Sequence, residues 1–202
     1  MKKIIAAAVI AAALSTAVSS ALAGTLVNPT VTLSNSGLSQ PTAITATHTT
    51  ATDVPANHFI LRFQLPADFT DIIVANQFSC TGVTLKIDGA PQTFGGFDPC
   101  GLTLGGFVYV RAPALVPSGS DVEVQLASTF YRTPATPGVK TFTLFQTANG
   151  AGNTIDEASP MPSVTINAPA AVPTMTEWAM ILLTAALGGF AALTIQRRRR
   201  TV

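Results

Sequence analysis

The chain has 202 residues, of which 48% are hydrophobic and only 10% are charged, whereas an ordinary soluble domain has about 25% charged residues. Its formal net charge is +1, but residues 24–172 hold five basic and nine acidic side chains and carry a charge of −4. Because that segment has no basic patch or stripe, nucleic-acid binding has no electrostatic support. The length allows one domain of ordinary size with apolar sequences at its two ends.

Residues 1–23 have the order of parts of a secretory signal peptide. Two lysines precede an apolar run at 4–14, and the small residues Ala21 and Ala23 occupy the positions that signal peptidase requires. We therefore predict a signal helix at 1–23, cleaved between Ala23 and Gly24, so that signal peptidase is an expected partner. The alternative is an uncleaved membrane helix, which the short apolar core and the cleavage pattern disfavour.

Residues 24–168 show successive β-strands separated by turns. Apolar and polar residues alternate, as a half-buried strand requires, at 58–65, 121–127 and 139–145. The first of these segments places on one face Phe59, Leu61, Phe63 and Leu65. Further strands are predicted at 25–33, 42–50, 71–78, 83–87, 107–111 and 163–167. The sequences between them are rich in Gly, Pro, Asn and Asp, and no helical period appears. We predict an all-β fold, a single antiparallel β-sandwich.

The two cysteines of the chain, Cys80 and Cys100, both fall in this segment. In an oxidising compartment such a pair is most simply a structural disulfide. The alternative is a reactive thiol pair or a metal site, but neither a CxxC motif nor a neighbouring histidine accompanies these cysteines.

No catalytic motif is present, so we expect neither an enzyme nor a cofactor. The histidines His48 and His58, with Asp53 between them, are a weak candidate for zinc. The oxygen-rich segments 67–71 and 149–157 are candidates for calcium, although their spacing fits no EF-hand. A ligand-binding module would need an exposed aromatic cluster, for which the available residues are Phe94, Phe97, Phe107, Tyr109, Phe130 and Tyr131.

The C-terminus combines a hinge rich in proline and alanine at 169–176 with an apolar segment and an arginine cluster at 177–202. The uncharged residues 179–195 would form a helix of about 26 Å, which just reaches the length of a membrane span. Four arginines follow, Arg197, Arg198, Arg199 and Arg200, and basic residues on one side place that end in the cytoplasm. We predict a transmembrane helix in the lipid bilayer; a buried core helix is the alternative.

This tail resembles the IPTL-CTERM sorting domain of Gram-negative bacteria, a relative of the PEP-CTERM signals. The family pattern Ile-Pro-Thr-Leu followed by Ser-Glu-Trp is matched by Val172, Pro173, Thr174 and Met175, then Thr176, Glu177 and Trp178. The direct matches are Pro173, Thr174, Glu177 and Trp178. The resemblance implies processing by an exosortase, a multi-pass membrane enzyme with a catalytic cysteine, which recognises the motif and removes the helix. A plain single-pass anchor is the alternative.

These features predict an exported, non-enzymatic structural protein of the cell surface or extracellular matrix. Before processing it would be held in the inner membrane with its C-terminus in the cytoplasm. The alternative is a membrane-anchored adhesin or a module that binds carbohydrate or calcium. The sandwich loosely resembles the immunoglobulin-like modules of bacterial surface proteins, and this analogy of fold carries no function by itself.

Overall fold

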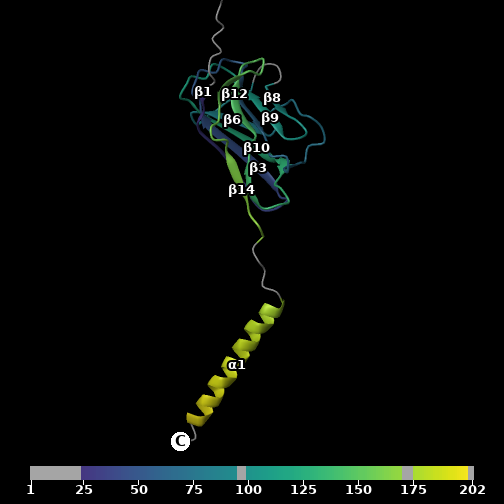
Figure 1. Ribbon diagram of the computed structural model, residues 1–202, viewed down its shortest axis with the longest axis vertical. Coiled ribbons are helices and arrows are strands. Elements are labelled where there is room, and N and C mark those ends of the chain that lie inside the picture. Colours follow the sequence, from purple (N-terminus) through teal and green to yellow (C-terminus); the bar gives the residue numbers. More distant parts are fainter. Residues whose placement is uncertain (1–23, 95–98, 170–174, 200–202) are drawn as a thin grey trace, which may run out of the picture.

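A computed structural model describes residues 24–94, 99–169 and 175–199 and shows two main β-sheets and one C-terminal helix (Figure 1). The strands of the first sheet are, in spatial order, β1 (Gly24–Thr25), β13 (Thr154–Glu157), β12 (Leu144–Ala148), β4 (Phe59–Gln64), β9 (Phe107–Arg111) and β8 (Cys100–Leu102). Those of the second sheet are β2 (Val27–Leu33), β3 (Pro41–Thr49), β10 (Asp121–Arg132), β6 (Val83–Ile87) and β7 (Ala90–Pro91), with β5 (Thr70–Asp71) also paired to β10. A small third sheet pairs β11 (Gly138–Thr141) with β14 (Ser163–Ile166), and α1 is the helix Met175–Arg199.

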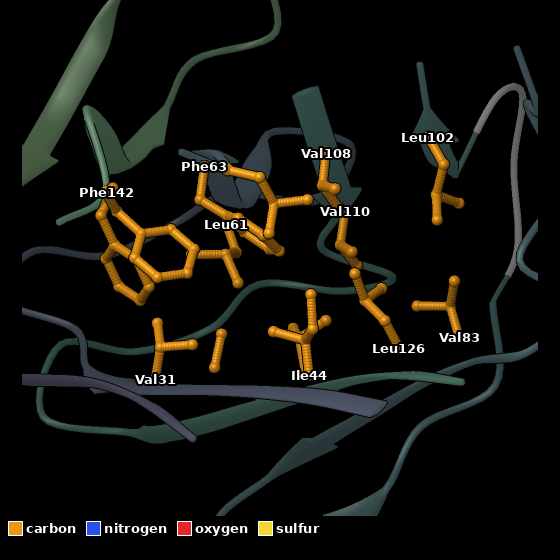
Figure 2. Packing of buried hydrophobic residues seen from close by; sticks show 14 of the residues in the cluster. Val31, Ile44, Leu61, Phe63, Val83, Leu102, Val108, Val110, Leu126 and Phe142 are labelled. Carbon is orange, nitrogen blue, oxygen red and sulfur yellow. The ribbon is translucent and has the colours of Figure 1, made fainter. Parts of the chain in front are cut away.

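The two main sheets enclose one hydrophobic core. Strand alternation sends every second side chain inward, so that β10 buries Val122, Val124 and Leu126 while the residues between them face out. Figure 2 shows these inward side chains meeting those of the opposite sheet, with Phe63, Val108 and Val110 on one side and Val31, Ile44 and Val83 on the other. The prediction of a mostly β-strand, two-sheet fold is confirmed.

The prediction of a wholly antiparallel sandwich is wrong at one edge. β1 runs parallel to β13, with Gly24 opposite Asp156 and Thr25 opposite Glu157. All the other strand pairs described here are antiparallel. The short β1 therefore closes the edge of the first sheet, and the chain then crosses into the second sheet as β2.

Two predicted strands differ from the observed ones. The predicted strand 71–78 is reduced to β5, and most of its residues form a loop. The predicted strand 139–145 is divided between β11 and β12, which lie in different sheets. Both Phe142 and Phe145 are buried. Since residues three apart point to opposite faces of a continuous strand, the strand must break for both rings to reach the core.

The prediction that Phe59 shares one face with Leu61, Phe63 and Leu65 is wrong, although Phe59 is buried. The register of β4 against β9 shifts between Phe59 and Leu61, so that Ile60 is an extra residue in the ladder. Such a bulge changes the face on which the preceding residue lies. Ile60, Leu61 and Phe63 enter the core, whereas Phe59 packs on the outer side with arginine and tyrosine side chains.

Candidate functional site

The C-terminal motif begins outside the described residues and continues into α1. Val172, Pro173, Thr174 and Arg200 lie outside the described residues, as do Ala21 and Ala23 of the predicted signal-peptidase site. Met175 is the first helical residue, Glu177 follows in the first turn, and Arg197, Arg198 and Arg199 form the last turn. Trp178 is 51% exposed, and large apolar side chains are exposed along the helix, Met180, Ile181, Leu182, Leu183, Leu187, Phe190 and Ile195.

The expectation of a transmembrane helix in the bilayer is corrected. Within the described residues, no helix has the length and apolar character required for a membrane span. The uncharged stretch 179–195 corresponds to about 26 Å of helix, whereas a bilayer core is about 30 Å thick. Thr184, Gly188 and Gly189 also interrupt its apolar character.

The disulfide prediction is confirmed. Cys80 and Cys100 form a bond with Cα atoms 5.2 Å apart and a sequence separation of 20 residues. Cys100 is fully buried in β8, at the edge of the first sheet. Cys80 stands in the turn that leads into β6 of the second sheet, where its carbonyl accepts the N–H of Val83 at 2.9 Å. The bond therefore joins the two sheets at one edge of the sandwich.

The structure does not bring the zinc candidates together. His48 is 2% exposed, and its ring meets the ring of Phe145 edge to face at 5.9 Å between centroids. Burial lowers the pKa of His48 to about 4, so the imidazole is neutral. His58 directly precedes β4 and lies next to Gly150. Asp53 accepts the N–H of Ser118 at 2.8 Å. Across the described ranges, no three His, Cys, Asp or Glu side chains are close enough to hold a metal ion.

The calcium candidates use their oxygen atoms within the protein. Asn149 accepts the N–H groups of Ala151 and Asn153 at 3.0 and 2.9 Å, which closes its own turn. Asp68 pairs with Lys140. Asp71 accepts the N–H of Gly105 at 2.7 Å. These contacts occupy Asn149, Asp68 and Asp71, whereas the Oδ1 atom of Asp156 in the second segment has no hydrogen-bond partner among the described residues.

The outer side of the first sheet carries an aromatic–arginine face, made of Phe59, Arg62, Phe107, Tyr109 and Arg111. The Cζ atom of Arg62 lies 5.2 Å from the centre of the Phe59 ring and 5.3 Å from that of Phe107. The Cζ atom of Arg111 lies 4.2 Å from the Phe59 ring, and Phe59 meets Tyr109 edge to face at 5.3 Å. Guanidinium groups at these distances from ring faces are attracted by cation–π interaction.

Backbone contacts fix the two arginines of this face. Arg62 donates to the carbonyl of Gly152 at 2.6 Å, and Arg111 donates to the carbonyl of Asn57 at 2.7 Å. Partial burial lowers the pKa of Arg62, which nevertheless stays charged. Gly101 makes room for the ring of Tyr109, because a Cβ at this position would overlap it. Phe59 is itself buried, at 9% exposure, so the rings that this face exposes in part are those of Phe107 and Tyr109, next to the charged Arg62 and Arg111.

The outer side of the second sheet is a threonine face. It comprises Thr30, Thr32, Thr45, Thr47, Thr49, Lys86, Asp121 and Glu123, which lie on four adjacent strands in register. Thr30 and Thr47 share a hydrogen bond of 2.6 Å, and Thr49 donates to Asp121 at 2.7 Å. Lys86 and Glu123 form an ion pair of 2.8 Å. A shallow pocket of about 320 Å³ lies over this pair and Asp121.

Sequence reasoning found part of the aromatic–arginine face. Phe107 and Tyr109 are among the aromatic residues expected for a ligand site, and the alternation of β9 puts them with Arg111 on one side. Phe130 and Tyr131 are buried instead. The pKa of Tyr131 is raised, mainly by burial and to a lesser extent by the nearby charge of Asp71. Phe94 packs against the core, and Phe97 lies outside the described residues. The contribution of Phe59 was missed, because the bulge at Ile60 has no signal in the sequence.

Comparison with known proteins identifies the tail. Residues 170–200 match the IPTL-CTERM motif. This motif implies an exported surface protein of Gram-negative bacteria that is processed by an exosortase-type enzyme. No curated protein sequence matches the chain. The crystal structure of BslA, a bacterial hydrophobin, is similar with a TM-score of 0.42 and 16% identity, covering 74% of this chain and 99% of that one. A likeness at this level carries no argument about function.

Proposed function

We propose that this protein is a non-enzymatic structural component of the cell surface or extracellular matrix, delivered there when an exosortase processes its tail. The observation that carries the proposal is the match of residues 170–200 to a sorting motif. In this proposal Pro173 and Thr174 are recognised by the exosortase, and α1 is the part that is removed. The sandwich is then released or transferred to another surface component.

The fold suits such a role. The two sheets share one continuous core and are joined by a disulfide, which resists unfolding outside the cell. The proposal includes the use of the sandwich as an immunoglobulin-like module, in which the outer faces rather than a catalytic pocket contact other molecules.

The experiment is the intact mass of the protein from its native host and from a strain without its exosortase. A chain that begins at Gly24 and ends near Pro173 in the first strain, and retains Arg197–Arg200 in the second, supports the proposal. A chain that retains the arginines in both strains contradicts processing of the tail. The variant Pro173→Ala supplies a matched test, since it changes the motif and leaves the described sandwich untouched.

A second candidate function is carbohydrate binding at the aromatic–arginine face. It is favoured by the half-exposed rings of Phe107 and Tyr109 beside the charged Arg62. Aromatic rings stack on the apolar sides of sugars, and guanidinium groups donate to sugar hydroxyls or carboxylates. The charge favours an acidic polysaccharide.

A binding assay with the exported chain and immobilised acidic polysaccharide tests this candidate. Binding that is lost in Phe107→Ala and retained in Lys86→Ala supports it, because Lys86 lies on the opposite, threonine face. Equal binding by both variants would place the contact elsewhere on the molecule.

A further inference from the structure

Asp156 is a buried side chain of which only one carboxylate oxygen accepts hydrogen bonds. It is 0% exposed. Its Oδ2 atom accepts the N–H and the hydroxyl of Thr52 at 3.1 and 2.8 Å. Its Oδ1 atom is buried and has no hydrogen-bond partner among the described residues. A buried carboxylate oxygen without a donor is costly, because the carboxylate has lost its hydration without replacement.

The lysines and arginines of the sandwich are used elsewhere. Lys86 pairs with Glu123, and Lys140 pairs with Asp68. Each of the three arginines donates to a main-chain carbonyl: Arg62 to that of Gly152, Arg111 to that of Asn57 and Arg132 to that of Ser39. The two ion pairs found in the described ranges leave Asp156 out. No side chain of the described residues therefore forms an ion pair with this carboxylate.

Gly24 is the backbone that lies against the unpaired oxygen. It stands opposite Asp156 in the parallel pairing of β1 with β13. The pairing continues with the N–H of Leu26, which donates to the carbonyl of Glu157 at 3.0 Å. A Cβ built on Gly24 would overlap the Oδ1 atom of Asp156. Because a Cβ lies about 2.5 Å from the nitrogen of its own residue, Oδ1 is within roughly 5 Å of the Gly24 nitrogen.

In the full chain the nitrogen of Gly24 belongs to a neutral peptide bond with Ala23. Cleavage between these residues, which the signal sequence predicts, converts it into an α-ammonium group that is charged below a pKa of about 8. We propose that the buried carboxylate of Asp156 is a binding site for this ammonium group, and that signal-peptide removal completes the sandwich by forming an internal ion pair. The ligand class is a primary ammonium, supplied by the chain itself.

The absence of a side chain at Gly24 is part of the site. Any Cβ would occupy the space next to Oδ1, so only glycine lets the amino group approach the carboxylate. Ala51 and Thr52 lie against the other side of this site. The neighbouring strand β12 fixes the backbone of Asp156, because the hydroxyl of Thr147 accepts the N–H of Asp156 at 3.0 Å. The precursor, which lacks the charge, is then less stable than the mature chain.

The test compares two chains with the same C-terminus, one that begins at Gly24 and one that begins at Leu22. The two extra residues of the second chain move its amino group about 7 Å along the chain. Each is made with Asp156 and with Asp156→Asn. We expect the extension to raise the equilibrium constant for unfolding in guanidinium by about tenfold or more when Asp156 is present, and by less than about threefold in Asp156→Asn. An equal effect in both backgrounds, or no effect in either, would overturn the proposal.

A second measurement needs no substitution, in case Asp156→Asn does not fold. Cyanate carbamylates a free amino group, and an ion pair in a closed pocket slows that reaction. The N-terminus of the folded chain that begins at Gly24 is expected to react about tenfold more slowly than that of the extended chain, and at a similar rate after unfolding in guanidinium. Equal rates in the two folded chains would show that the ammonium group does not enter the pocket. Neither measurement depends on processing of the C-terminal tail. A negative result would therefore overturn the ion pair and leave the proposed function unaffected.

Discussion

The two main sheets bury the same kind of core but present different outer faces. The first sheet displays rings and guanidinium groups, which are planar and weakly hydrated. The second displays hydroxyl groups and ion pairs in register on adjacent strands. Each sheet also buries ionisable side chains, Asp156 in the first and His48 and Tyr131 in the second. The alternation of strands determines which side chains are hidden, while the choice of polar residue between them determines what each sheet can contact.

The disulfide joins these two sheets, and its removal is expected to have the largest effect. In the double variant Cys80→Ala/Cys100→Ala the free energy of unfolding falls by about 3 kcal/mol, because the unfolded chain gains the freedom of an open loop. Guanidinium unfolding followed by fluorescence measures this change. Reduction of the unmodified protein is the matched control and gives the same loss; a loss well below that of the double variant would mean that the alanines, and not the missing bond, destabilise the fold.

The buried histidine makes the second sheet sensitive to acid. Burial lowers the pKa of His48 to about 4 from its ordinary value of 6.5, so the unfolded chain binds a proton more readily than the folded one. Stability from this group is complete above pH 6.5 and is lost as the pH falls toward 4. Between pH 7.5 and pH 4.5 the expected loss is about 2–3 kcal/mol.

Urea unfolding at these two pH values, in the protein and in His48→Leu, measures the histidine contribution. The variant is expected to lose less stability on acidification than the unmodified protein by about that amount. His58→Gln is the control, since it removes the other histidine and leaves the buried ring in place. If His48→Leu shows the same acid sensitivity as the unmodified protein, the histidine is not its source.

Strand alternation explains how much of this arrangement can be predicted from sequence. Period-two segments identified β4 and β10, the further strand predicted at 107–111 matches β9, and the cysteine pair identified the bond between the sheets. The break after Thr141 and the bulge at Ile60 could not be predicted, because each depends on which distant strand the chain pairs with. The site beside Asp156 depends on a contact between the two ends of the domain, 132 positions apart in the numbering. No local pattern reports such a contact.

Gly101 offers the finest test of the difference between the two faces. A Cβ at this position would overlap the ring of Tyr109, and its backbone does not require glycine for any other reason. Gly101→Ala is therefore expected to lower the free energy of unfolding by about 1–2 kcal/mol through overpacking. In the background of Tyr109→Ala the same substitution is expected to cost nearly nothing, since the ring is absent. A thermodynamic cycle of these variants measures the coupling.

A coupling near zero would mean that Tyr109 swings aside freely, so that the aromatic–arginine face is not a fixed surface. A coupling of about 1 kcal/mol or more would mean that Phe59 and Arg111 hold the ring where it is. In that case Gly101→Ala also weakens any ligand bound to this face, while the threonine face, which has no contact with Gly101, keeps its stability and its ion pair. The outer surface of the first sheet is then a preformed binding platform, and that of the second a hydrated surface.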